Sequence, residues 1–208
     1  MVKKYTKKEA VSIAITSAKL YKKNFVGKEF LFIIIDKKKK VYSFKTEFQA
    51  SNFQHLTGLK STNKKLSHLD FYNLCLKARL KESDIEFNPN GTTHQKLSVL
   101  SLILKNQNLS VNMVGNYNNS YPLLYTEKLV GNTKWALGFI DVTGKGKFIP
   151  NTLLEGDVRN IVNEPYRVIA TYVKEKSELN FSNRIYLATN INFEELKYPC
   201  DWNNLPRL

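Results

Sequence analysis

The segment Phe53-Gln54-His55-Leu56-Thr57-Gly58-Leu59 carries the side chains of this chain that are best suited to chemistry. His55 can take up or release a proton near neutral pH, because an unperturbed imidazole has a pKa of about 6.5. Thr57 could donate a hydrogen bond to a phosphate oxygen, and the Gly58 N–H could do the same if the turn forms an anion-binding nest. The structural alternative is a tight turn in which His55 is partly buried and bonded to a backbone carbonyl.

Metal-free cleavage of RNA requires three kinds of group. A base removes the 2′-OH proton, an acid protonates the leaving 5′-oxygen, and a cation or hydrogen-bond donor stabilises the charge on the reacting phosphate. His55 is the candidate base or acid, and Lys96 and Lys147 are the candidate cations. The alternative for Lys96 is a solvated lysine in the first turn of a helix.

Other constellations that could carry chemistry are missing from the sequence. His68 and His94 have no partner at a metal-ligand spacing such as H-x₃-H, and no group of carboxylates suggests a two-metal nuclease. Gly144-Lys145-Gly146-Lys147 lacks the frame of a phosphate-binding loop and predicts a basic hairpin turn. Cys75 and Cys200 fit no metal or redox motif and suit a reducing compartment. We expect no metal ion and no cofactor.

The positive charge is concentrated in the N-terminal third. The formal net charge is +14, and residues 1–65 hold 16 lysines against four acidic residues, whereas the rest of the chain holds 16 basic and 14 acidic residues. Such an uneven field attracts polyanions, although a solvated, lysine-rich surface is the structural alternative. The lysines expected to contact nucleic acid are Lys37, Lys38, Lys39, Lys40, Lys60, Lys64, Lys65, Lys145 and Lys147.

Helical patterns and one hairpin fill the N-terminal half. The capping box Thr6-Lys7-Lys8-Glu9 predicts a helix that ends near Lys23. Two apolar segments flank the lysines of residues 37–40 and predict a hairpin with a basic tip. These elements are followed by two further amphipathic helices. The hairpin strands are expected at residues 30–35 and 41–44, and the two helices at residues 67–80 and from Thr92 through Leu104.

From about Leu109 the apolar residues alternate, which predicts antiparallel strands. Polar segments at residues 116–120 and 143–147 predict hairpin turns. Helices followed by antiparallel strands indicate an α+β fold, in which helices pack on one face of a sheet. The expected strands span residues 110–114, 123–125, 135–140, 166–173 and 184–187.

The motif Phe53–Gly58, placed after a basic hairpin, resembles that of proteins from phages and mobile elements. These are the Barnase–EndoU–colicin–RelE-like phage nucleases of the fourth subgroup, whose motif is F-x-H-L-T-G, usually with Pro at x. Lys96-Leu97-Ser98-Val99-Leu100 is similar to a basic helix start in that family, and Ile149-Pro150-Asn151-Thr152-Leu153-Leu154 is similar to its P-x-[ST]-L-L element. The resemblance covers about residues 28–190.

The resemblance implies the fold of small metal-independent ribonucleases, in which helices precede a four-stranded antiparallel sheet. We therefore expect an N-terminal helix and a basic hairpin, with two further helices packed on a C-terminal antiparallel sheet of about four strands. The expected organisation is a single domain over residues 1–208. It would contain a helical extension at residues 1–27, a nuclease-like domain at residues 28–190 and an irregular tail at residues 191–208.

The resemblance also adds Thr152 as a candidate hydroxyl, and the alternative is that Thr152 caps the segment that follows it. Two positions depart from the family pattern. Gln54 replaces the usual proline, which alters the rigidity of the turn more than its chemistry. Asn151 stands where relatives often have a basic residue. The candidate catalytic residues are His55, Thr57, Lys96 and Thr152.

Two functions are compatible with these features. The first is a nuclease-like protein of a phage or mobile element that cleaves RNA without metal through a site centred on His55, with nucleic acid as its partner. The second is a non-enzymatic binder that uses the basic N-terminal third, such as an anti-CRISPR-like inhibitor of a host defence ribonucleoprotein. Asn151 and the lack of a second histidine near the motif favour the second. Either would act in the cytoplasm of a bacterial host, because no secretory signal or membrane span is apparent.

Overall fold

The computed structural model describes residues 3–105, 111–120, 126–192, 196, 202 and 205. The strand expected at residues 123–125 lies outside the described residues, as do Cys200 and most of the expected tail. All the elements considered below come from the described part of the chain.

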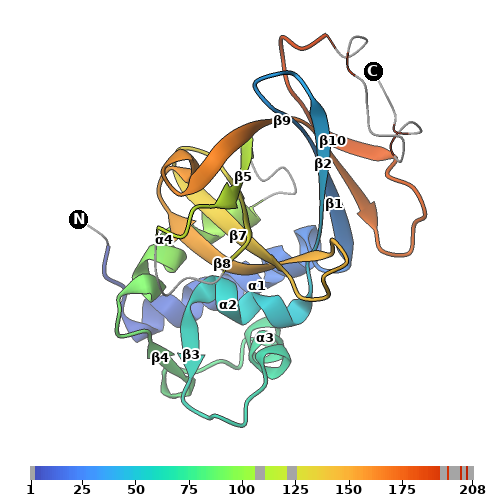
Figure 1. The fold of residues 1–208 in the computed structure, drawn as a ribbon. Helices are drawn as coiled ribbons and strands as arrows, with labels where there is room; N and C mark the ends of the chain where they lie inside the picture. The colour runs from blue at the N-terminus through green and yellow to red at the C-terminus, as the bar shows by residue number, and fades with distance from the viewer. Residues whose placement is uncertain are drawn as a thin grey trace.

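Seven strands of one sheet close into a barrel (Figure 1). Their order is β1-β2-β8-β7-β6-β5-β9, and β9 pairs with β1 to complete the ring. Neighbouring strands are antiparallel except β2 and β8, and β10 extends the sheet beside β9. The strands are β1 (Lys28–Ile35), β2 (Val41–Glu47), β5 (Met113–Tyr117), β6 (Lys128–Gly131), β7 (Trp135–Asp141), β8 (Phe148–Glu155), β9 (Val162–Glu175) and β10 (Asn183–Leu187).

The expected C-terminal sheet of about four strands with two helices packed on it is wrong. The reason lies in β9, which is 14 residues long. Its first part pairs with β5, where Tyr117 lies opposite Val162. Its second part pairs with β1, where Ile33 lies opposite Ala170. The basic N-terminal hairpin is therefore built into the same sheet as the C-terminal strands.

Strand β1 is buried on both faces. Phe30 and Phe32 belong to the core that the helices cover, whereas Leu31 and Ile33 belong to a second apolar cluster on the opposite face. A strand with two buried faces has a continuous apolar sequence rather than an alternating one. The run Phe30–Ile35 is such a sequence, and it places β1 in the middle of a sheet rather than in an isolated hairpin.

Four helices and a small second sheet complete the described fold. The predicted capping box is confirmed: the Thr6 side chain accepts a hydrogen bond from the Glu9 N–H, and the Glu9 carboxylate accepts one from the Thr6 N–H. Among the described residues, none of the helices is long and apolar enough to cross a membrane. The helices are α1 (Lys7–Asn24), α2 (Phe53–Thr57), α3 (His68–Leu76) and α4 (Thr92–Leu104), and the small sheet consists of β3 (Leu59–Ser61) and β4 (Ile85–Phe87).

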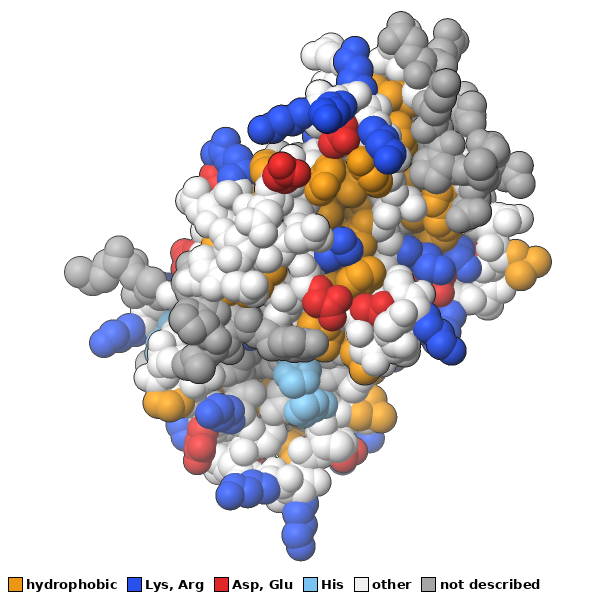
Figure 2. Space-filling model, viewed as in Figure 1, with side chains coloured by type: hydrophobic (Ala, Val, Ile, Leu, Met, Phe, Trp, Pro, Cys, Tyr) orange, Lys and Arg blue, Asp and Glu red, His pale blue; other side chains and the backbone are white. Residues whose placement is uncertain are grey.

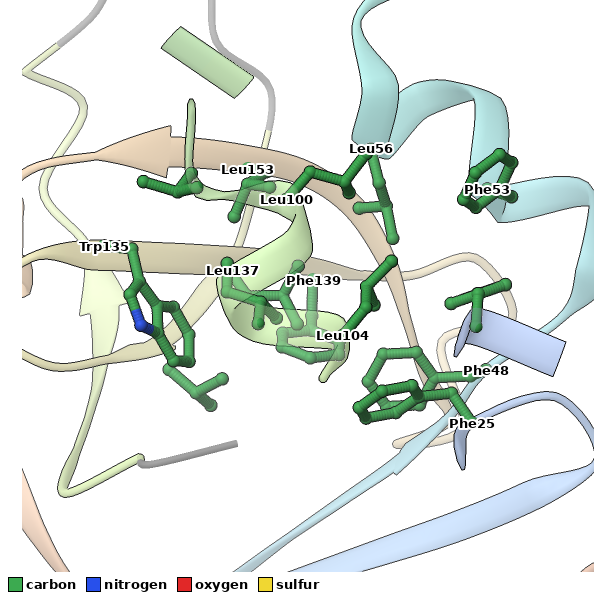
Figure 3. Packing of buried hydrophobic residues seen from close by; sticks show 14 of the residues in the cluster. Phe25, Phe48, Phe53, Leu56, Leu100, Leu104, Trp135, Leu137, Phe139 and Leu153 are labelled. Carbon is green, nitrogen blue, oxygen red and sulfur yellow. The ribbon is translucent and has the colours of Figure 1, made fainter. Parts of the chain in front are cut away.

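The helices pack against one face of the barrel sheet and form the main core (Figure 3). Leu100 and Leu104 of α4 lie against Leu137 and Phe139 of β7, all of them buried. Helix α2 packs on β8 and also contacts α3 and α4. The core therefore holds α2 against the sheet on one side and against two helices on the other.

Candidate functional site

Within the segment Phe53–Thr57, which forms α2, only His55 is exposed. Phe53 and Leu56 are buried in the main core, where Phe53 contacts the rings of aromatic residues from α1 and α3. Gln54 is buried as well, and its Nε2 donates to the Leu59 carbonyl and to the Ser61 hydroxyl. The apolar residues of the motif thus anchor a short helix that presents one imidazole to solvent.

Thr57 and Gly58 shape the turn that ends α2. Thr57 is fully buried, and its hydroxyl donates to the Gln54 carbonyl at 2.7 Å and accepts from the Leu59 N–H at 3.0 Å. Gly58 has a φ of 68°, in the left-handed region that favours glycine. The donor and one acceptor position of the buried Thr57 hydroxyl are used inside the protein, so the side chain holds the turn together.

Gly58 also makes room for Lys96 of α4. A Cβ on Gly58 would lie 2.8 Å from the Lys96 Cδ and 3.2 Å from the Thr93 Cα, so another residue here would force the lysine stem to shift. The Lys96 Nζ donates to the His55 carbonyl at 2.8 Å. Loss of hydration in this half-buried position lowers the pKa of Lys96 to about 8. Lys96 is therefore tied directly to the backbone of the histidine motif.

Thr93 joins α4 to the same turn. Its hydroxyl donates to the Gly58 carbonyl at 2.7 Å and accepts from the Asn88 N–H at 2.9 Å. Thr93 is fully buried. A single hydroxyl therefore fixes the start of α4, the end of α2 and the segment after β4 relative to one another.

A second histidine lies against the first. His68 is the first residue of α3, whose N-terminus is capped by the Ser67 hydroxyl. The rings of His55 and His68 meet edge to face, with their centroids 4.3 Å apart. Two exposed histidine side chains in contact are visible below the centre of Figure 2. The pKa of His55 is lowered, first by partial desolvation and then by the charges of His68 and Lys96.

These three side chains line an open cleft of about 550 Å³. The small sheet forms another wall of the cleft. Lys60 of β3 lies opposite Glu86 of β4 in the register of the two strands. The polar groups around the cleft therefore include two imidazoles, a partly desolvated ammonium group and a carboxylate. The other polar residues that line it are Gln54, Ser61, Asn63, Lys64 and Asn88.

The predicted lysines fall into separate regions. Lys60 and Lys64 line the cleft, and Lys65 follows as an exposed neighbour. Residues 37–40 form the turn between β1 and β2, at the opposite end of the molecule from β3, β4 and α3 (Figure 1). Residues 145–147 belong to the turn between β7 and β8, where Lys147 forms a salt bridge with the buried Glu47.

The structure does not bring Thr152 into the cleft. Thr152 lies on β8 opposite Gly138, and its methyl group is 2.6 Å from where a Cβ on Gly138 would lie. Successive strand residues face opposite sides of a sheet, and the next residue, Leu153, belongs to the core under the helices. Thr152 therefore faces the other side of β8. Beside it, the Asn151 Oδ1 accepts a hydrogen bond from Thr126.

His68, Glu86 and Asn88 were not among the residues predicted for the site. The sequence shows that His68 starts a helix, but not that this helix places the imidazole against α2. Glu86 and Asn88 come from a short strand that pairs with β3 immediately after the histidine turn. Among the described residues, no three or more His, Cys, Asp or Glu side chains form a group that could hold a metal ion.

Comparison with known families agrees with this motif. Residues 15–189 match a family described as phage-Barnase-EndoU-ColicinE5/D-RelE like nuclease4, or PBECR4. The chain belongs to this family. The PBECR4 match includes α2, α3 and α4, which carry His55, His68 and Lys96. It confirms the family resemblance predicted from the motif, and a nuclease-like family implies nucleic acid as the kind of substrate. No curated protein and no solved structure matches the chain.

Proposed function

We propose that the protein cleaves RNA by general acid–base catalysis in the cleft formed by α2, α3 and α4. The observation that carries this proposal is the contact between the His55 and His68 rings, next to Lys96, on the wall of that cleft. Two imidazoles can supply a base and an acid at the same pH, and a cation next to them can stabilise a pentavalent phosphate. Membership of a nuclease-like family supports the choice of substrate class.

His55 acts as the base in this proposal. Because its pKa is lowered, the His55 ring stays neutral at pH values where an ordinary histidine is already protonated. A neutral ring can accept the 2′-OH proton. The 2′-oxygen then bonds to phosphorus, and the bond from phosphorus to the 5′-oxygen breaks. Protonated His68 gives its proton to that 5′-oxygen. The products are a 2′,3′-cyclic phosphate and a 5′-hydroxyl.

Lys96 stabilises the charge that develops on the phosphate oxygens. Its ammonium group lies at the His55 carbonyl, and none of the salt bridges among the described residues involves it. Lys60 and Lys64 at the cleft wall draw the RNA backbone toward the imidazoles. The buried hydroxyl of Thr57 supports a positioning role rather than a direct one, and Thr152, which lies outside the cleft, takes no part in the proposed reaction. Such a nuclease would work on RNA in the cytoplasm of its bacterial host.

Cleavage products test this chemistry directly. A single-stranded RNA should yield fragments that end in a 2′,3′-cyclic phosphate, whereas DNA and 2′-O-methyl RNA of the same sequence should stay intact, because neither has a free 2′-hydroxyl. Fragments with 5′-phosphate ends, or equal cleavage of RNA and DNA, would contradict the proposal. A stable stoichiometric complex with nucleic acid and no turnover would favour the non-enzymatic binder.

A further inference from the structure

A group of aromatic side chains from β2, β8 and β9 lies on the helix-facing side of the barrel. Tyr42 and Phe44 are two residues apart on β2 and so share a face, and Phe44 belongs to the main core. Tyr42 contacts the ring of Tyr166 of β9 at 5.6 Å, and Phe44 contacts that of Phe148 of β8 at 5.0 Å between centroids. We call these four residues the aromatic patch.

The barrel is weakly closed next to this patch. Strands β2 and β8 pair at one position, Thr46 with Phe148, whereas β1 and β2 pair along seven. Tyr42, Phe148 and Tyr166 are consequently only half-buried, although they pack against the main core. Apolar side chains are exposed along this face in Figure 2, in a stripe that has both basic and acidic side chains beside it.

Two lysines lie over the rings of the patch. The Lys40 Nζ is 5.2 Å from the centroid of Tyr42, and the Lys128 Nζ is 5.6 Å from that of Phe148. Within the described residues, neither lysine forms a salt bridge. The Lys128 Nζ donates to the Asn116 side chain, which positions the ammonium above the patch. The surface thus combines three half-buried aromatic rings with two lysines, and the Asp36 carboxylate lies at its edge, where it accepts a hydrogen bond from the Tyr42 hydroxyl.

We propose that the aromatic patch binds single-stranded nucleic acid, with bases stacked on Tyr42 and Tyr166 and phosphates held by Lys40 and Lys128. Every base offers a flat face to an aromatic ring, so such stacking needs no particular sequence, and neighbouring cations follow the backbone. A duplex hides these faces in its own stack. The net charge of +14 favours a polyanion over an apolar or basic peptide.

The patch and the histidine cleft share a structural support. Phe148 is the first residue of β8, and α2, which carries His55, packs on the same strand. The apolar stripe in Figure 2 runs from the end of the β1–β2 hairpin toward the pair of histidines. The inference rests on the proposed function in one respect: a strand held on the patch is the substrate that the cleft cleaves.

Binding of a fluorescent single-stranded 2′-O-methyl RNA tests the patch without cleavage. Tyr42→Leu and Tyr166→Leu should each weaken binding about tenfold, which corresponds to one lost stacking contact. Tyr42→Phe keeps the ring and should bind like the wild type. Tyr5→Leu is the matched control, because Tyr5 is also half-buried but stacks on His94 at the start of α4. An abasic oligomer with the same number of phosphates should bind the wild type more weakly than the RNA.

Unchanged affinity in both leucine variants would contradict base stacking on the aromatic patch. Equal binding of abasic and base-containing oligomers would contradict it as well. Lys128→Gln should weaken binding more than Lys134→Gln, which removes an exposed lysine on the turn between β6 and β7. The His55→Ala variant separates the two proposals, because it should lose cleavage and keep binding. If the wild type binds through the patch but cleaves nothing, the proposed function fails and the patch stands.

Discussion

The imidazole rings of His55 and His68 touch edge to face, with centroids 4.3 Å apart, although they come from different helices. Lys96 from a third helix reaches the carbonyl of His55. Three groups that can carry a positive charge are thereby held together on one wall of a cleft. Their mutual repulsion disfavours the charged forms, and a bound phosphate would offset that repulsion.

The pH dependence of cleavage should reveal the lowered pKa of His55. A base works only when deprotonated, so activity should fall as the pH drops through the pKa of His55, below the ordinary value of about 6.5. His68→Asn removes both the proposed acid and a neighbouring positive charge, so it should slow cleavage and shift the pKa of His55 upward. Histidine NMR titrations of the two proteins would measure the shift. A limb above pH 6.5 in the wild type would contradict the assignment.

Gly58→Ala should disturb both the backbone and Lys96. The left-handed φ costs a non-glycine residue about 1 kcal/mol, and the new Cβ would press on the lysine stem. Gly91→Ala is the matched control, because Gly91 also has a positive φ but has no atom within 4 Å of its added Cβ. Both variants should lose stability in thermal unfolding, but only Gly58→Ala should also lose cleavage. Equal effects on activity would argue against a role for the Gly58–Lys96 contact.

Thr57→Val should lower stability because it leaves the Gln54 carbonyl and the Leu59 N–H without their buried partner. The expected loss is about 1–3 kcal/mol in the free energy of unfolding, and Thr57→Ser should recover most of it. Urea unfolding of the three proteins measures this directly. Full stability of Thr57→Val together with abolished cleavage would instead indicate that the hydroxyl takes part in the reaction.

Lys147 and Lys145 should behave differently although they are two residues apart. Lys147 forms a salt bridge with Glu47, which is 4% exposed, whereas Lys145 is exposed. Lys147→Gln should therefore reduce stability by roughly 1 kcal/mol, because the lysine is partly solvated, and Lys145→Gln should have little effect. Thermal unfolding at matched salt compares them. Weaker nucleic-acid binding in Lys147→Gln at unchanged stability would contradict the structural role.

The sequence singled out both His55 and Lys96, which line the same cleft, because a distinctive motif and a helix start mark them. The sequence did not reveal that His68 belongs to the cleft. Helical periodicity indicates which face of α3 is buried, but it does not indicate which helix the N-terminus of α3 contacts. The sequence assigned Thr57 to chemistry, although a hydroxyl before a left-handed glycine is equally suited to closing the turn. The role of the Thr57 hydroxyl depends on partners that only the folded turn supplies.

The three longer helices and several strands were predicted, whereas α2, β3, β4, β6, β8 and the assembly of the sheet were missed. The capping box, the basic hairpin and the helix from Thr92 are present, because each depends on local residue types. The closure of the barrel depends on pairing between β1 and the second half of β9, more than 130 residues apart in the chain. Neither strand carries a local signal for that partner, apart from the continuous apolar run that predicts burial on both faces.

The rate of RNA cleavage in EDTA, compared between the wild type, His55→Ala and His94→Ala, tests the central claim most directly. His94 is the control because its ring contacts Phe87 and its Nδ1 accepts the Tyr5 N–H, away from the cleft. Loss of a general base should slow cleavage by about 10²–10⁴-fold in His55→Ala. His94→Ala should cleave at nearly the wild-type rate. The same rate in wild type and His55→Ala would contradict a reaction centred on His55.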